Sequence, residues 1–135
     1  WLSVAAVVAL TGGCSTMKSW TGMGSAKLSG KEESPPVNTS ASGTSTIAVK
    51  DDRTVSGNVT VSGMMPTAAH IHDGAPGKSG PVIVPLTKSG DNTFTVPPGT
   101  KLSDDLYKEY KAGNLYVNVH SAMHPNGEVR AQLKP

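Results

Sequence analysis

The histidines of this chain fall into two short groups whose spacing is typical of a metal site. His70 and His72 form a His-x-His pair, and His120 and His124 form the second group. Side chains alternate along a strand, so His70 and His72 would share one face, with Cα atoms roughly 6.5–7 Å apart. A strand ending at His120 and lying beside that pair would bring all the imidazoles together. We therefore expect His70, His72 and His120 to bind a metal ion, with His124 or a methionine completing the set.

The donor types indicate which metals fit. Three or four imidazoles without a thiolate suit copper or zinc. Met64, Met65 and Met123 lie next to the histidine segments in the sequence, and a thioether is a soft ligand that favours Cu(I). Met64 and Met65 can equally fill gaps in a core, which is the commoner use of methionine. Copper, as Cu(I) or Cu(II), is the metal that we expect, with zinc as the alternative. Met123 is a better candidate ligand than Met64 or Met65.

The first residues resemble the signal of a bacterial lipoprotein. Leu2 to Leu10 is an apolar run that is too short to span a bilayer and has the length of a signal-peptide core. Small residues follow directly before Cys14, although Leu10 stands four places before this cysteine where three is usual. The alternative is a buried strand over residues 4–10. We expect a signal peptide over 1–13 that continues upstream, a lipidated Cys14, and a flexible tether over 14–26. The residue after Cys14 is not Asp, which is typical of lipoproteins anchored at the periplasmic face of the outer membrane.

The elements that must position the histidines read as one small β-domain over residues 27–135. Alternating apolar residues predict strands at intervals, and one helix is expected after Ser103, a good N-cap, with Gly113 at its end. In the strand ending at His120, the apolar and the polar side chains point to opposite faces. Seven or eight short strands indicate an antiparallel β-sandwich or barrel. The expected strands are an edge strand at 27–32 and strands at 43–50, 54–61, 68–72, 81–86, 93–96, 115–120 and 128–133.

Composition excludes several classes of function. The formal net charge of +2 comes from scattered basic residues, so no nucleic-acid partner is expected. Cys14 is the single cysteine, which rules out an intrachain disulfide. No Ser-His-Asp or paired-carboxylate signature of a hydrolase stands out, because Asp104 and Asp105 are explained by a helix start.

With these segments placed, the chain resembles the CHRD (chordin-type) domain family from about Lys27 to its C-terminus. The resemblance implies an immunoglobulin-like or Cu/Zn superoxide dismutase-like sandwich. It also implies that His70, His72 and His120 are a recurring polar cluster, which is associated with copper in bacterial members, whereas Met123 and His124 fall in a more variable stretch. Asn118 and Arg130 match as well, and we expect both to hold the final hairpin. The matching segments are 28–30 with 33–37, 69–72 with 77–86, 115–121 and 125–133.

The function expected is copper sequestration, buffering or delivery outside the cytoplasm, with a periplasmic copper protein as a possible partner and the oligomeric state left open. One alternative is a superoxide dismutase-like copper enzyme, although the loop after His72 offers no further histidine before His120 and no disulfide is available. A second alternative is a metal-free binding or adhesion module in which the histidines are structural. Catalysis is therefore not the expected role.

Overall fold

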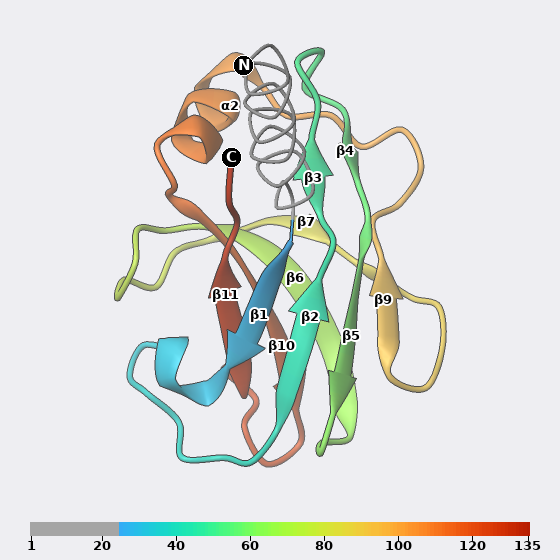
Figure 1. Cartoon of the computed structure of the whole chain (residues 1–135), viewed down its shortest axis with the longest axis vertical. Helices are drawn as coiled ribbons and strands as arrows, with labels where there is room; N and C mark the ends of the chain where they lie inside the picture. Colours follow the sequence, from blue (N-terminus) through green and yellow to red (C-terminus); the bar gives the residue numbers. More distant parts are fainter. Residues whose placement is uncertain (1–24) are drawn as a thin grey trace, which may run out of the picture.

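The structure, a computed structural model, describes residues 25–135 and consists of strands with one α-helix and one 3-10 helix (Figure 1). The expected signal peptide, Cys14 and nearly all of the expected tether lie outside the described residues. Within residues 25–135 no helix is both long and apolar enough to cross a membrane. The elements are β1 (Ala26–Ser29), the 3-10 helix η1 (Gly30–Glu32), β2 (Ser42–Ser45), β3 (Ala48–Val49), β4 (Val55–Ser56), β5 (Asn58–Ser62), β6 (Pro66–Asp73), β7 (Val82–Pro85), β8 (Thr87–Lys88), β9 (Thr93–Thr95), α2 (Asp104–Lys111), β10 (Leu115–Ser121) and β11 (Val129–Gln132).

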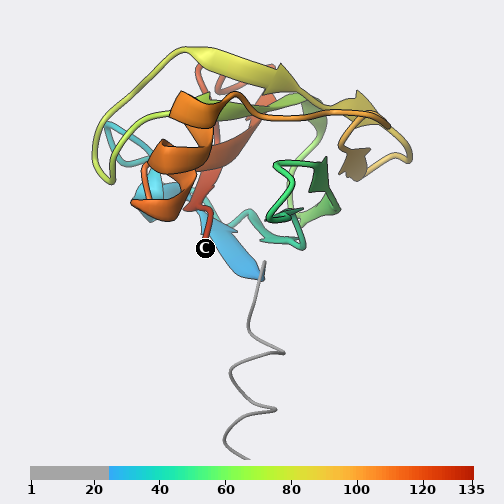
Figure 2. The ribbon, with the colours of Figure 1, turned by 90° about the horizontal axis from the view of Figure 1, so that it is seen from above.

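Nine of these strands form one antiparallel sheet in the order β7-β6-β10-β11-β1-β2-β5-β9-β8, and β3 pairs with β4 in a separate ribbon. The sheet curls until it is nearly closed. Figure 2 shows β6 and β7 on one side of the molecule and β1 and β2 on the other, with the core between them. The expected all-β, sandwich-like fold with one short helix is therefore confirmed.

The core follows the apolar alternation of the strands. In β10 the buried side chains on the core face are Leu115, Val117 and Val119, and Ile71 of β6 is buried beside them. The structure divides the chain into more strands than the expected seven or eight, because breaks interrupt the longer alternations. At the break between β4 and β5, Gly57 has a φ of +119°, and a Cβ there would lie 2.7 Å from the Cα of Ile47. The segments of the strands expected at 43–50 and 54–61 nevertheless pair with each other as a hairpin, in the antiparallel pairs β2–β5 and β3–β4.

The expectation of an edge strand at 27–32 is wrong. β1 lies inside the sheet, where it pairs with β2 along its whole length and meets β11 at Ser29. Pro35 and Pro36 lack a backbone N–H and would favour an edge position, but they lie beyond η1 and do not interrupt the pairing of β1. The edges of the sheet are β7 and β8 instead.

The helix forms as its sequence predicts. The Ser103 side chain accepts a hydrogen bond of 3.2 Å from the backbone N–H of Leu106, which caps α2. Gly113 follows the helix with a φ of +83°. Tyr110 is buried, and its hydroxyl donates to the carbonyl of Lys134, so α2 is fixed to the end of the chain.

Candidate metal centre

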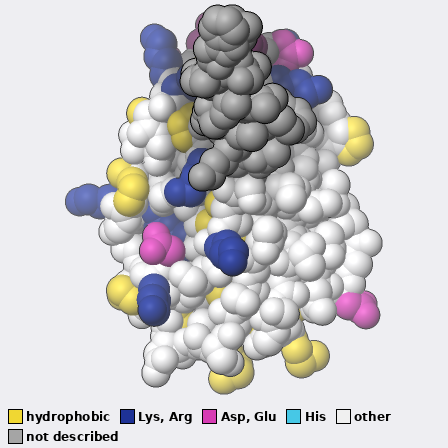
Figure 3. Space-filling model, viewed as in Figure 1, with side chains coloured by type: hydrophobic (Ala, Val, Ile, Leu, Met, Phe, Trp, Pro, Cys, Tyr) yellow, Lys and Arg dark blue, Asp and Glu magenta, His cyan; other side chains and the backbone are white. Residues whose placement is uncertain are grey.

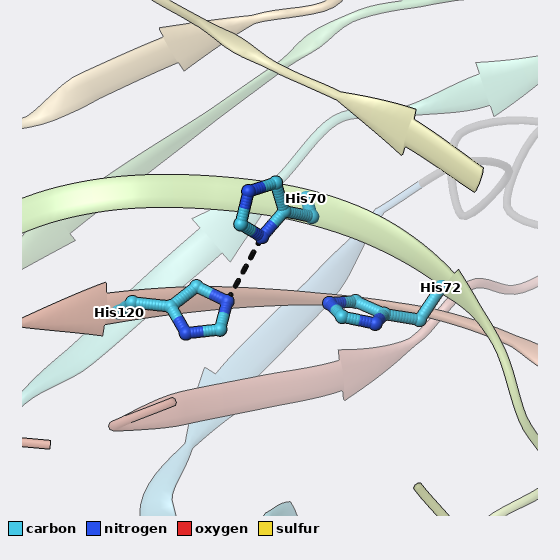
Figure 4. Close-up of side chains that lie close together, drawn as sticks. All are labelled: His70, His72 and His120. Atoms are coloured by element: carbon cyan, nitrogen blue, oxygen red, sulfur yellow. Dashed lines mark hydrogen bonds between the residues drawn. The ribbon is translucent and has the colours of Figure 1, made fainter. Parts of the chain in front are cut away.

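The pairing of β6 with β10 brings three histidines together on the face opposite the core. In the register of this pair, His70 lies opposite Asn118 and His72 opposite Tyr116. Ala69 of β6 is buried toward the core, so its neighbours His70 and His72 point the other way. Figure 4 shows their rings converging with that of His120. One ring nitrogen from each of the three histidines lies within 4.8 Å of the other two.

Two of the three histidines contact each other directly. Nδ1 of His70 lies 3.0 Å from Nε2 of His120. The second nitrogen of His120, Nδ1, lies 2.9 Å from the carbonyl oxygen of Pro125, so it must carry a proton and donate it. Nε2 of His120 is therefore the free acceptor, and it faces His70.

His72 has the same arrangement of its two nitrogens. Its Nδ1 lies 3.0 Å from the carbonyl oxygen of Gly80 and donates to it. Its Nε2 is buried and has no hydrogen-bond partner among the described residues. In metalloproteins, a ligating histidine almost always donates its second ring N–H to a carbonyl, carboxylate or water. His72 and His120 both meet that condition before any metal is considered, and the donor set fits a metal ion that accepts imidazole nitrogens.

The electrostatics favour the neutral form of His70 and His72. Burial lowers the pKa of His70, and the neighbouring His120 and His72 lower it further. Burial also lowers the pKa of His72, although the hydrogen bond to Gly80 and the nearby Asn118 oppose that shift. Neutral imidazole is the form that binds metals, so His70 and His72 are in the ligating form at neutral pH.

An aromatic and cationic stack supports His72. The rings of His72 and Tyr116 are parallel, with an angle of 1° between their planes and 4.7 Å between their centroids. The guanidinium carbon of Arg130 lies 3.4 Å from the centroid of the Tyr116 ring. Because β6 and β11 flank β10, the Tyr116 ring is held between His72 and Arg130. This stack fixes the plane of the His72 ring.

The segment 74–80 is tied down over the same face by buried side chains. Arg130 donates to the carbonyls of Lys78 (2.8 Å) and Ala75 (3.0 Å), and the Tyr116 hydroxyl accepts a hydrogen bond of 3.1 Å from the Gly80 N–H. A Cβ at position 80 would overlap the carbonyl oxygen of Asp73, so only glycine fits this close approach. These contacts place the Gly80 carbonyl where it accepts from His72.

Two further polar side chains, those of Glu33 and Asn118, are buried near the histidine cluster. Glu33 Oε2 and Asn118 Oδ1 are buried and lack a hydrogen-bond partner among the described residues. Burial raises the pKa of Glu33 to about 7, against the opposing effects of Asn118 and Arg130. A Cβ at Gly127, where φ is +122°, would lie 2.5 Å from Glu33 Oε2 and 2.6 Å from Asn118 Nδ2. Glycine at this turn therefore allows the Glu33 and Asn118 side chains to meet.

The other expected ligands do not join the group. His124 lies in the β10–β11 connection, where its backbone N–H donates to the Ser121 hydroxyl, and its ring is not among the converging nitrogens. Met65 and Met123 are 86% and 85% exposed. Together with Met64 they line a separate groove that none of the three clustered histidines borders. Among the His, Cys, Asp and Glu side chains of residues 25–135, the converging group consists of His70, His72 and His120.

Sequence reasoning missed the residues that surround the histidine cluster. Alternation places Tyr116 and Asn118 on the face of His120, but it does not predict that both are buried beside the cluster. Arg130 was expected to hold the final hairpin, whereas its guanidinium also binds the segment 74–80. Glu33 carried no signal beyond its place in the matching segment 33–37, because the approach of its side chain to Gly127 is a long-range contact.

Comparison with known proteins identifies a family that the chain matches. A family model described as the CHRD domain matches residues 24–133. No curated protein and no solved structure matches the chain.

Proposed function

Because the chain belongs to the CHRD domain family, we propose that its His70–His72–His120 cluster binds a copper ion and that the protein sequesters, buffers or delivers copper. The family and the histidine cluster are the premises. Copper itself is inferred from the chemistry of the three side chains.

The observation that carries the proposal is the state of the His72 ring. Its Nδ1 is engaged by the Gly80 carbonyl, and its Nε2 is buried without a partner among residues 25–135. A buried polar atom that makes no hydrogen bond costs about 1–3 kcal/mol. The fold accepts this cost at a nitrogen that points toward two other imidazoles, and coordination of a metal ion would remove it.

The donor set favours copper over other metals. All three converging donors are imidazole nitrogens, and no carboxylate or thiolate is part of the group. Hard cations such as Mg²⁺ and Ca²⁺ require oxygen ligands, so they do not fit. Among first-row divalent ions, Cu²⁺ binds a given set of nitrogen ligands most tightly; Zn²⁺ binds such a set more weakly but also accepts imidazole ligands. Zinc is accordingly the competitor that the experiment must include.

A titration with Cu²⁺, followed by electron paramagnetic resonance, tests the proposal directly. One equivalent should bind and give a spectrum with hyperfine coupling to imidazole nitrogen, and a parallel Zn²⁺ titration compares the two metals. The triple variant His70→Ala/His72→Ala/His120→Ala should lose this signal, whereas the matched control His124→Ala should keep it. Equal copper affinity in a folded triple variant would show that the site lies elsewhere.

We also propose that the protein acts at the cell envelope, anchored by a lipid on Cys14 at the periplasmic face of the outer membrane. The support is the apolar run 2–10 and the small residues before the single cysteine. At that location, a periplasmic copper protein would be the partner for delivery. This proposal is independent of the metal and has its own test in the Discussion.

A further inference from the structure

A groove of about 300 Å³ separate from the histidine cluster lies between the β5–β6 and β10–β11 connections. Both connections lie at the lower end of the molecule in Figure 1, where hydrophobic side chains protrude in Figure 3. Three of the five methionines of the chain line this groove. Its lining residues are Gly63, Met64, Met65, Ser121, Ala122, Met123 and Glu128.

Packing does not account for Met65 and Met123. Met65 and Met123 are 86% and 85% exposed, and the described residues contain just one other exposed large hydrophobic side chain, Val82. Methionine ordinarily fills gaps in a core, and a methionine that stays exposed contributes no stabilising burial of apolar surface. Met64 is partly buried against the core and brings a third thioether to the same groove.

The groove also carries a negative charge. Glu128 is buried, and its two carboxylate oxygens accept 2.6 Å hydrogen bonds from the hydroxyls of Ser121 and Thr39. Burial by itself would raise the pKa of Glu128, but these hydrogen bonds and the nearby His124 outweigh it and hold that pKa below its ordinary value. Across residues 25–135, the single ion pair joins Arg53 to Asp104, so no salt bridge neutralises this carboxylate.

We propose that this groove is a second metal site, in which the thioethers of Met64, Met65 and Met123 bind a soft monovalent cation, Cu(I) or Ag(I). Thioether sulfur selects soft ions such as Cu(I) over harder divalent ions. The charge of Glu128 favours a cation over a neutral ligand at close range. The unbranched methionine side chains have enough rotatable bonds to converge on one ion.

This site does not depend on copper binding by the histidines. It uses different residues, and its neutral thioethers have no proton to lose or gain in the physiological range. Binding in the groove should therefore persist at pH 5, where an imidazole site is weakened by protonation. The two sites share the β10–β11 connection, since Met123 lies two residues before Pro125, the acceptor for His120.

Ag(I) is the probe that tests the site, because it is soft, monovalent and stable in air. The full chain carrying Cys14→Ser removes the competing thiol, and isotope labelling of the methionine methyl groups gives each of the five methionines a separate resonance. The methyl signals of Met64, Met65 and Met123 should shift on adding Ag(I), at pH 7 and at pH 5. Met17 and Met23, on the same chain, are the internal controls. Equal shifts of all five signals would overturn the proposal.

A variant series completes the test. The background variant is Cys14→Ser/His70→Ala/His72→Ala/His120→Ala. In this background, Met64→Leu/Met65→Leu/Met123→Leu should weaken Ag(I) binding by about tenfold or more, because the loss of groups that merely support a metal ligand already lowers metal affinity by about tenfold. The matched control, Met17→Leu/Met23→Leu, should leave the affinity unchanged. Leucine keeps a similar apolar volume, and the positions are largely exposed, so folding should be unaffected. Unchanged binding in the Met64/Met65/Met123 variant would refute the site without bearing on the histidine cluster.

Discussion

Nδ1 of His70 lies 3.0 Å from Nε2 of His120, which requires one proton between the two nitrogens. The proton of His120 is on its Nδ1, which donates a hydrogen bond to the carbonyl of Pro125, so the proton between the two rings belongs to Nδ1 of His70. A metal ion that uses both nitrogens has to displace this proton, either to Nε2 of the same ring or to solvent. In the metal-free cluster, a hydrogen bond thus joins two of the nitrogens that would bind the ion.

Copper affinity should fall as the pH decreases, with the fall beginning below about 6.5, the ordinary pKa of histidine. Burial, helped by the neighbouring rings, lowers the pKa of His70, and burial lowers that of His72. Both rings therefore stay neutral to a lower pH than a free histidine. Competition against a chelator of known affinity between pH 8 and pH 5 measures the profile. A loss of affinity that starts well above pH 7 would contradict the neutral cluster.

The domain should fold without metal. Its core of buried apolar side chains is on the opposite face of β6 and β10 from the histidines, so it does not need the ion. Thermal unfolding in the presence of a chelator should be cooperative, and Cu²⁺ should raise the midpoint because it binds the native state. A chain that stays unfolded until copper is added would disprove a preformed scaffold.

Replacing Glu33 with Gln should stabilise the metal-free protein at high pH. The pKa of Glu33 is raised from 4.5 to about 7 in the folded state. Between these two pH values the folded protein therefore keeps a proton on Glu33 that the unfolded chain has lost. Stability is then lost as the pH rises through about 7. The free energy of unfolding of Glu33→Gln relative to that of the parent should increase by about 2 kcal/mol when the pH is raised from 5 to 8.

Urea unfolding of parent and variant at both pH values measures this difference, and Glu32→Gln, at the exposed neighbouring position, is the control. If the parent and Glu33→Gln differ by the same amount at pH 5 and pH 8, the carboxyl does not titrate in this range.

Replacing Tyr116 with Phe should weaken both the fold and the metal site. The ring still stacks on His72, but the Gly80 N–H loses its acceptor. A loss of about 1 kcal/mol in stability is expected from one hydrogen bond. Copper affinity should drop roughly tenfold, because the Gly80 carbonyl that orients His72 is less well fixed. Tyr107→Phe, on the helix away from β6 and β10, should change neither quantity, and an unaltered copper affinity in Tyr116→Phe would remove Tyr116 from the support of the site.

Cys14 should carry a diacylglycerol in the mature protein. The apolar run before it and the small residues at 11–13 predict this modification. Mass spectrometry of protein extracted from its native membrane should find the lipid on Cys14 and no residues before it. Detection of residues 1–13 in the mature protein would contradict the signal-peptide assignment.

The sequence predicted the histidine cluster better than it predicted what surrounds it. Alternation along β6 and β10 is a local property, so it placed His70, His72 and His120 on one face of their strands before the pairing was known. The burial of Glu33 and the contact of Arg130 with Lys78 depend on segments far apart in the chain, and no local pattern reports such contacts. No local pattern reports either that Met64, Met65 and Met123 line one groove, because the segments that carry them are far apart in the chain.

The same strand pairing sets when a binding site can exist during folding. His70 and His120 are 50 residues apart in the chain and come into contact through the antiparallel register of β6 and β10. Closing a loop of that length carries an entropic cost that local contacts do not. In a chain that is still emerging or unfolded, His70 is near His72 but not near His120, and the third imidazole joins the pair when the sheet forms. The proposed three-imidazole site is therefore a property of the finished fold.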